Sequence, residues 1–343
     1  KNQLSKMIRR VIGEIQILYA KKWGRIECTK IVLCGNTAME CFARGVSVLG
    51  LSHFPFSVPD NFGYEIHFSQ IFDISVPVSP ECTVFFAPVI GPFIGGDTVC
   101  AMLSCFFSDK IKENAVFLAD VGTNCEIAVF LKSQKKIICT SSAAGPAFEG
   151  QGISCGMAAS NGAIARVHPD KKSPTGFCCS VIGGEKAKGI CGSGLLEAVS
   201  SFYANGTINS NGTFKFAQDK VELIDGICLT QNDLRQFQLA KAAIQSALLF
   251  LKTKSNENDC GLFLAGGFGS VLSSDAALAI GMIPENIFKT IVQAGNAALS
   301  GAILLLNDEW KNKATEIVKM SKWYDLAEEK NFQELYISSL QFP

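Results

Sequence analysis

The sequence predicts an α/β protein in which mixed sheets are flanked by helices. Three observations support this prediction. Residues 29–34 form a short β-branched run that stops at a Gly-Asn turn, and a helical pattern follows over 37–43. Residues 115–142 contain three strand-like runs joined by two turns, which predicts an antiparallel meander. Residues 290–293 form a strand that enters a helix over 296–307.

Other segments fit the same architecture. Residues 3–22 carry apolar residues at helical spacing, which predicts a first helix with one buried face. Thr230 followed by Asp233 predicts a capping box for a helix that runs to about Lys254. Its inner face is expected to be formed by Leu234, Phe237, Ala240, Ile244 and Leu248.

The apolar segment 82–107 is long enough for a membrane span but contains Asp97. An acid at the bilayer centre costs about 2.5 to 3.5 kcal/mol, and prolines and glycines interrupt the segment in its middle. We therefore expect a buried strand, a turn and a buried helix.

Composition and charge exclude several classes of protein. Of the 343 residues, 48% are hydrophobic and 18% charged, so the chain can bury a large core divided between two domains. Its 31 basic and 31 acidic residues cancel, which argues against nucleic acid or a membrane surface as a partner. No signal peptide is evident, since Glu14 interrupts the first apolar stretch, and the cysteine usage described next favours a cytoplasmic protein.

The 14 cysteines contain no CxxC pair, which argues against a zinc ribbon or an iron–sulfur cluster within this chain. Most of them occur in apolar segments, where a free thiol packs as a small hydrophobic group. We therefore expect the cysteines to be reduced.

The strongest candidate for chemistry is an acid at a strand end followed by a glycine turn, Asp120 to Asn124. Gly122 would adopt a backbone conformation closed to other residues and so free amides for a phosphate, while Thr123 and Asn124 would add side-chain donors. Asp120 would supply the hard oxygen that Mg²⁺ prefers. The alternative is an ordinary hairpin turn, in which Asp-x-Gly is common.

Three other features are candidates. The strand 261–265 runs into a glycine-rich turn, which would let the backbone approach an adenine or ribose, or would only begin a helix. Asp97 is either a helix N-cap or an acid that faces water or a metal. The Gly- and Ser-rich segment 141–163 is too long for an idle connector and is interpreted as a functional loop.

Eight blocks of sequence cover nearly the whole chain: GNTAM (35–39), GGDTVCAML (95–103), DVGTNCEI (120–127), SSAAGPAFEGQGISCGM (141–157), GICGSGLLEAV (189–199), TQNDLRQFQLAKAAI (230–244), AGGFG (265–269) and ELYISSLQFP (334–343). Together they resemble the superfamily of acetate and sugar kinases, heat-shock ATPases and actin, in which two ribonuclease H-like lobes close on ATP. Within that superfamily, the sequence is similar to the ATPase domain of the reductive activators of corrinoid proteins.

The resemblance implies an actin-like ATPase fold in three parts. Residues 1–108 would be the remainder of the first lobe with the first connecting helix. Residues 109–290 would be the second lobe, which carries the phosphate hairpin and the adenosine loop. Residues 291–343 would supply the second connecting helix and a C-terminal segment.

The resemblance also implies roles for particular residues. Asp120, Gly122, Thr123 and Asn124 would form the second phosphate hairpin, with Asp120 at Mg²⁺. Gly266, Gly267 and Gly269 would form the adenosine loop, and Gly145 would also contact the nucleotide. Asp97 would be the acid of the first connecting helix, and residues 295–301 would belong to the second. Glu149, the only acid in the functional loop, would contact Mg²⁺ or water, or would be a solvated loop acid.

The implied activity is ATP-driven reduction of a corrinoid cofactor from cobalt(II) to cobalt(I) on a corrinoid protein or a corrinoid methyltransferase component. ATP and Mg²⁺ are the implied cofactors, and a homodimer is left open. The first phosphate hairpin and the iron–sulfur domain of the family are not found in this sequence. We expect the intact protein to carry both, with the [2Fe–2S] cluster in an N-terminal domain, and this chain alone to hydrolyse ATP poorly.

Two alternatives remain at this stage. A small-molecule kinase of the same superfamily would transfer a phosphoryl group to a soluble metabolite. A nucleotide-sensing module would dock on the corrinoid protein without turnover. The fold alone does not choose among these activities, because function resides in the site.

Overall fold

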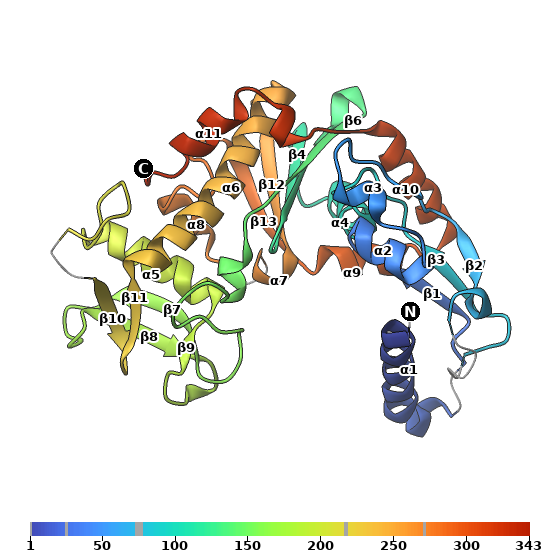
Figure 1. Ribbon diagram of the computed structural model, residues 1–343, viewed down its shortest axis with the longest axis horizontal. Coiled ribbons are helices and arrows are strands. Elements are labelled where there is room, and N and C mark those ends of the chain that lie inside the picture. The colour runs from blue at the N-terminus through green and yellow to red at the C-terminus, as the bar shows by residue number, and fades with distance from the viewer. Residues whose placement is uncertain (1, 25–26, 73–77, 216–218, 270–271) are drawn as a thin grey trace. The chain divides into compact units, whose positions relative to one another are not determined.

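The computed structural model describes residues 2–24, 27–72, 78–215, 219–269 and 272–343 (Figure 1). The chain divides into two compact units. Unit 1 consists of residues 1–108 and 297–323, and unit 2 of residues 109–296 and 324–343. Both contain sheets flanked by helices, which confirms the predicted α/β class.

Unit 1 is built on a small sheet in the order β1-β3-β2. Strand β1 (Lys30–Leu33) is parallel to β3 (Thr83–Phe86), and β2 (Glu65–His67) is antiparallel to β3. The other elements of the unit are α1 (Asn2–Trp23), α2 (Thr37–Arg44), α3 (Leu49–Ser52), α4 (Gly96–Phe106), α9 (Ala297–Leu304), α10 (Asp308–Met320) and the short strand β14 (Ser321–Trp323).

The apolar segment 82–107 forms the predicted strand, turn and buried helix, which are β3 and α4. In the described part of the chain, none of the helices combines the length and apolar character needed to cross a bilayer.

Helices α4 and α9 pack with their backbones in close approach. A Cβ atom added to Gly301 of α9 would stand 1.8 Å from the carbonyl oxygen of Cys100 in α4, so only glycine fits at this position. The hydroxyl of Ser104 also donates to the carbonyl oxygen of Ala297 over 3.0 Å. The two helices, nearly 200 residues apart in sequence, therefore form one tight pair.

Helix α1 has the predicted extent, but the prediction that its apolar residues form one buried face is wrong. Ile12 is buried, whereas Met7, Val11 and Leu18 are 64%, 54% and 71% exposed. The spacing of the apolar residues predicts the helix correctly because it follows the helical repeat. It does not indicate how much of the apolar face a neighbouring element covers.

Unit 2 contains the larger mixed sheet, whose five strands within this unit follow the order β13-β12-β4-β5-β6. These strands are β13 (Phe288–Gly295), β12 (Cys260–Ala265), β4 (Ala115–Val121), β5 (Cys125–Leu131) and β6 (Lys136–Ser142). Strands β4, β5 and β6 form the predicted antiparallel meander. Strand β12 lies parallel to both β4 and β13.

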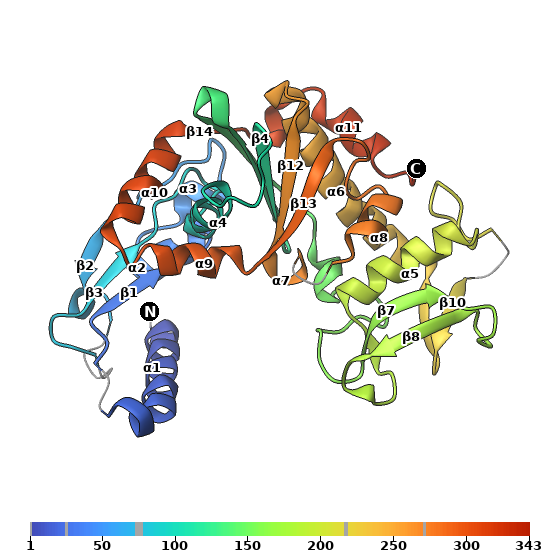
Figure 2. The same ribbon diagram turned by 180° about the vertical axis from the view of Figure 1, so that it is seen from behind.

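The long helix α6 (Gln231–Ser255) packs on one face of this sheet, where it contacts β5 and β6 (Figures 1 and 2). Its predicted capping box is present, since the hydroxyl of Thr230 accepts from the amide of Asp233 and the Asp233 carboxylate accepts from the amide of Thr230. The five residues predicted for the inner face are all buried. Both predictions for this helix are confirmed.

The remaining elements of unit 2 include a second sheet of order β8-β7-β9, across which α5 lies in Figure 2, whereas α7 contacts the large sheet and α11 packs on α6. They are β7 (Ala163–Pro169), β8 (Phe177–Val181), β9 (Gly189–Ile190), α5 (Gly192–Ala204), the hairpin of β10 (Lys220–Ile224) and β11 (Ile227–Thr230), α7 (Gly266–Gly269), α8 (Ser274–Ala279) and α11 (Phe332–Ser338). All 14 cysteines lie within the described residues and are free thiols.

Candidate functional site

Two bends of the chain lie side by side at one edge of the large sheet. Strand β4 ends near Asp120 and β12 ends at Ala265, and these two residues are register partners in a parallel pair. Because parallel strands present their carboxyl ends at the same edge, the turn after β4 and the turn after β12 leave the sheet together. In open α/β sheets this edge is where ligands bind.

Gly266, the first residue after β12, makes this approach close. Its φ of +91° lies in the left-handed region that favours glycine. A Cβ at this position would stand 2.5 Å from the carbonyl oxygen of Val121 and 2.7 Å from Oδ1 of Asp120. The two bends are therefore in contact through a position that only glycine can occupy. Gly267 is exposed beside it, and Gly269 ends α7.

The turn after β4 is tight, but the prediction that Gly122 adopts a backbone conformation closed to other residues is wrong. The amide of Gly122 donates to the carbonyl oxygen of Asn124 over 3.0 Å, which closes the turn. Gly122 is not among the residues with positive φ, and a Cβ there would meet Asn124 O only at 3.4 Å. The turn therefore does not require the special backbone freedom of glycine at this position.

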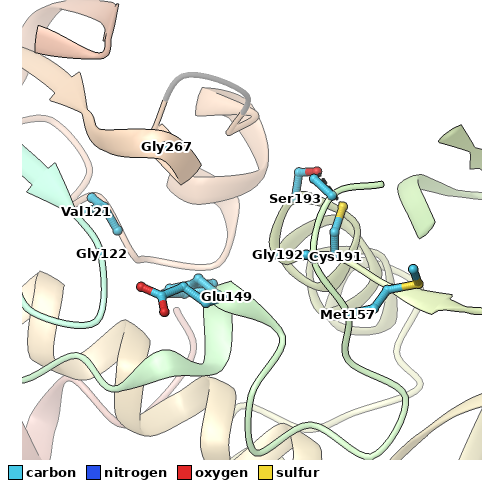
Figure 3. A pocket seen from close by; sticks show the side chains of 11 residues that line it. Val121, Gly122, Glu149, Met157, Cys191, Gly192, Ser193 and Gly267 are labelled. Carbon is cyan, nitrogen blue, oxygen red and sulfur yellow. Dashed lines mark hydrogen bonds between the residues drawn. The ribbon is translucent and has the colours of Figure 1, made fainter. Parts of the chain in front are cut away.

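Glu149 is held against this turn by a direct hydrogen bond. The hydroxyl of Thr123 donates to Oε1 of Glu149 over 2.6 Å, so the hydroxyl predicted as a phosphate donor is directed to a carboxylate. The amide of Gly145 donates to the carbonyl oxygen of Thr123 over 2.8 Å. The functional loop thus returns to the hairpin at two points, and Figure 3 shows the Glu149 carboxylate pointing toward Gly122.

A pocket of about 300 Å³ lies in unit 2 at these bends. Val121 and Gly122 of the first bend, Gly267 of the second and Glu149 of the loop all line it. Small-molecule sites begin at about this volume. On the opposite side, as Figure 3 shows for the labelled residues, lie residues of the functional loop and of α5. The further lining residues are Phe148, Met157, Ala158, Ala159, Cys191, Gly192 and Ser193.

The start of α5 is the part of the site that the sequence prediction missed. Cys191 is the N-cap and Gly192 begins this 13-residue helix, whose first turn contains no acidic residue. The first amides of a helix have no partner within the helix and carry partial positive charge, so they favour an anion. The sequence Cys-Gly-Ser-Gly before an apolar helix was the signal that could have identified this position.

Asp97 belongs to unit 1, so the pocket of unit 2 is formed without it. The alternative that Asp97 is an N-cap is wrong, because Gly95 is the N-cap of α4 and Asp97 lies inside the first turn. Its Oδ1 accepts from the amide of Thr98 over 2.7 Å. Burial raises the pKa of the Asp97 carboxyl above its usual value.

Glu40 lies beside Asp97 in the same unit and is almost fully buried. Its Oε1 accepts from the amide of Gly35 over 3.1 Å, whereas Oε2 has no hydrogen-bond partner among the described residues. Burial raises the pKa of the Glu40 carboxyl to about 9, and the neighbouring acid Asp97 adds to the shift. Glu40 is therefore protonated at neutral pH, and sequence reasoning did not single it out.

The oxygen atoms near the pocket suit a hard cation only if a ligand contributes the rest of the coordination. Among the described residues, no group of three or more His, Cys, Asp or Glu side chains is arranged to hold a metal ion. Mg²⁺ is commonly held by one or two carboxylates together with substrate phosphates. Asp120, adjacent to the pocket, and Glu149, which lines it, match that requirement.

Comparison with known proteins places these features in a family. The sequence matches the family described as the C-terminal domain of RACo, the ASKHA domain, over residues 114–343, and the RACo middle region over residues 1–110. The corrinoid activation enzyme RamQ of Eubacterium limosum is 30% identical over 91% of this chain and 56% of its own length. The [Co(II) methylated amine-specific corrinoid protein] reductase of Methanosarcina barkeri is 30% identical over 76% of this chain and 52% of its own length.

Among solved structures, the reductive activator for corrinoid, iron–sulfur protein superposes with a TM-score of 0.80 at 26% identity. The match covers 100% of this chain and 57% of that protein. The chain thus spans about half the length of the relatives it matches, and it has the actin-like fold of the ASKHA domain. Because the family match extends over both the sheet that carries the two bends and the loop that carries Glu149, the chain belongs to the RACo family of reductive activators of corrinoid proteins.

Proposed function

We propose that this chain is the nucleotide-binding part of an ATP-dependent reductive activator, which returns a corrinoid protein from the cobalt(II) to the cobalt(I) state for methyl transfer. The observation that supports it most directly is the contact between the two bends at Asp120 and Gly266, at the carboxyl edge of a sheet in a domain of the ASKHA family. Among the relatives, RamQ is named as a corrinoid activation enzyme, and the Methanosarcina barkeri protein is named as a reductase of a Co(II) methylated amine-specific corrinoid protein.

The residues of the pocket have the chemistry that a nucleotide requires. The glycine-rich turn after β12 offers backbone without side chains to a flat base or ribose, and the amides at the start of α5 favour an anion. Each charge-assisted hydrogen bond to a phosphate contributes about 1.5 to 3 kcal/mol, so a few such bonds hold a triphosphate. Asp120 and Glu149 would hold Mg²⁺, which would neutralise charge on the phosphates.

ATP would act by changing the relative stability of two conformations. A ligand shifts such an equilibrium only by as much as it binds one conformation better than the other. For one electron, about 59 mV corresponds to about 1.4 kcal/mol, so several kcal/mol of differential binding covers a gap of one to a few hundred millivolts. The electron itself would come from a [2Fe–2S] cluster in the intact protein.

The first experiment tests nucleotide binding through thermal melting. Ligand at about 100 times its dissociation constant adds about 2.7 kcal/mol to the stability of the state that binds it. We expect MgATP to raise the melting temperature of the wild-type chain and Asp120→Asn to reduce that rise. The matched control is Asp225→Asn, the same substitution at an exposed turn between β10 and β11 whose φ of +55° asparagine also tolerates.

The possible outcomes distinguish a wrong role for Asp120 from a wrong proposal of nucleotide binding. An unchanged MgATP response in Asp120→Asn would remove Asp120 from the site, and no response in the wild type would overturn nucleotide binding. The activity itself is tested with the intact protein and an added chemical reductant as electron donor, by following ATP-dependent formation of cobalt(I) on a corrinoid protein by visible absorbance. Phosphoryl transfer to a soluble metabolite, in place of phosphate release, would instead identify a kinase.

A further inference from the structure

Thr123 and Glu149 form a side-chain contact that the turn after β4 does not need for its own shape. The backbone already closes this turn, since the amide of Gly122 donates to the carbonyl oxygen of Asn124 over 3.0 Å. The hydroxyl of Thr123 donates instead to Oε1 of Glu149, 26 residues further along the chain, over 2.6 Å. Both side chains are exposed, and a hydrogen bond that competes with water contributes little to the stability of a fold. Fold stability therefore does not explain the contact.

The backbone of Glu149 is fixed on both sides of this residue. Glu149 is the last residue of a short 3-10 helix, and the amide of Gly150 closes that helix by donating to the carbonyl oxygen of Ala147 over 3.1 Å. Phe148, the residue before Glu149, is buried and packs edge-on against Phe237 of α6, with ring centroids 5.6 Å apart. The freedom left to Glu149 is therefore mainly rotation within its own side chain.

Thr123 is fixed from the side of the hairpin. Val121 and Cys125, on either side of the turn, are register partners in β4 and β5. The carbonyl oxygen of Thr123 also accepts from the amide of Gly145 over 2.8 Å. Because threonine is branched at Cβ, its side chain has few rotamers. The hydroxyl thus reaches Glu149 from a rigid support.

This hydrogen bond selects one orientation of the Glu149 carboxylate. A glutamate side chain has three rotatable bonds, and fixing them costs conformational entropy. The hydroxyl of Thr123 occupies only Oε1, so Oε2 remains for another partner. Figure 3 shows the carboxylate pointing toward Gly122, and both residues line the pocket. The hydrogen bond therefore holds the carboxylate toward the pocket before a cation binds, which reduces the ordering cost of binding.

The negative charge of Glu149 is available to a cation. None of the ion pairs found in the described part of the chain includes this residue. No lysine or arginine among those pairs neutralises the carboxylate. A side chain that orients a metal-binding carboxylate acts on the metal from outside its coordination shell, and its loss typically lowers metal affinity about 10- to 100-fold.

We propose that Thr123 is a positioning residue for Mg²⁺, which orients the Glu149 carboxylate through its hydroxyl and does not bind the nucleotide phosphates. A hydroxyl has one proton to donate, and that of Thr123 is directed to Glu149. This inference rests on the proposed function, in which Asp120 and Glu149 hold the cation of MgATP. It replaces the phosphate role that the resemblance implies for this hydroxyl.

The test measures two affinities of the intact protein by isothermal titration calorimetry, one for MgATP and one for ATP with a chelator in place of Mg²⁺. The wild type should bind MgATP more tightly than metal-free ATP. Thr123→Val keeps the branched side chain and removes the hydroxyl. It should lower the affinity for MgATP about 10- to 100-fold and leave that for metal-free ATP unchanged, whereas Thr123→Ser should keep the wild-type preference.

Two further comparisons test the contact itself. In a Glu149→Gln background, Thr123→Val should cause no further loss of MgATP affinity, because the carboxylate that the hydroxyl orients is absent. Thr207→Val is the matched control, since the Thr207 hydroxyl also donates over 2.6 Å, to Oδ1 of Asn205, and Thr207 does not line the pocket. This control should leave both affinities unchanged.

Each contrary result has a distinct meaning. Equal losses of affinity for MgATP and metal-free ATP in Thr123→Val would identify Thr123 as a phosphate donor and overturn the inference. Unchanged affinities in this variant would overturn it as well, and both results would leave nucleotide binding in place. A wild type that binds metal-free ATP as tightly as MgATP would overturn the role of the cation. A wild type that binds neither form would overturn the proposed function, and this inference with it.

Discussion

Replacing Gly266 with alanine should destabilise the contact between the two bends by a predictable amount. The φ of +91° at this residue costs an L side chain about 1 to 2 kcal/mol. The new Cβ would also stand 2.5 Å from the carbonyl oxygen of Val121 and 2.7 Å from Oδ1 of Asp120. Val121 belongs to a paired strand, so relief requires a backbone shift.

Overpacking of this kind typically costs about 1 to 3 kcal/mol. Together with the conformational cost, the expected loss in the free energy of unfolding for Gly266→Ala is about 2 to 5 kcal/mol. Denaturant unfolding measures it as a lower midpoint with an unchanged slope. For the proposed nucleotide site, the stabilisation by MgATP should fall as well, because the added methyl group would displace the Asp120 carboxylate.

Gly226→Ala is the matched control, since Gly226 has a φ of +82° and nothing within 4 Å of an added Cβ. It should lose only the conformational part, about 1 to 2 kcal/mol. The difference between the two variants isolates the steric contact with β4. Equal losses in the two variants would refute the inference that Gly266 is required by close approach.

Three further predictions concern buried polar groups. Burial raises the pKa of Glu40 to about 9, so the folded chain keeps a proton that the unfolded chain releases above its usual pKa of 4.5. The free energy of unfolding should therefore fall as pH rises from about 4.5 to about 9. Glu40→Gln should flatten the plot of melting temperature against pH, and an unchanged slope in this variant would contradict the prediction. Lys241 is buried and donates to the carbonyl oxygens of Ser339 and Gln341, so Lys241→Met should cost about 2 to 4 kcal/mol in denaturant unfolding. Burial lowers the pKa of Lys241 from 10.5 to about 8, so between these two pH values the unfolded chain binds one proton more than the folded chain. The wild type should therefore gain stability relative to Lys241→Met as pH rises from about 8 to 10.5. A stability difference between the two proteins that stays constant with pH would contradict this prediction. The Asp233 carboxylate accepts hydrogen bonds from the amides of Thr230 and Ser154. Asp233→Ala should therefore lower the free energy of unfolding by about 2 to 4 kcal/mol and speed hydrogen exchange at the amide of Ser154. Unchanged exchange at Ser154 would mean that other contacts hold the functional loop.

Local signals predicted the elements that depend on neighbouring residues. The capping box of Thr230 and Asp233 and the hairpins on either side of β5 were predictable, because three or four adjacent residues determine each of them. The exposed face of α1 was not predictable, because burial depends on which distant element packs there.

In the candidate site, too, the features set by adjacent residues were predictable and the contacts between distant segments were not. The sequence identified Asp120 and the turn at Gly266, but their contact arises from the parallel pairing of strands about 140 residues apart. For Glu149 the predicted role was contact with Mg²⁺ or water, with a solvated loop acid as the alternative, and the structure adds its hydrogen bond to Thr123, which the sequence did not predict. Cys191 and its neighbours at the start of α5 were missed, since small residues before a helix are common and carry no charge.

The glycine contact between α4 and α9 has a mechanical consequence. With Gly301 pressed on the carbonyl group of Cys100, neither helix can slide or roll along the other without a steric collision. The chain leaves unit 1 shortly after α4 ends, at residues 108 and 109, re-enters it directly before α9 begins, at residues 296 and 297, and leaves it again at residues 323 and 324. The first two of these passages therefore begin and end at one rigid helix pair within unit 1.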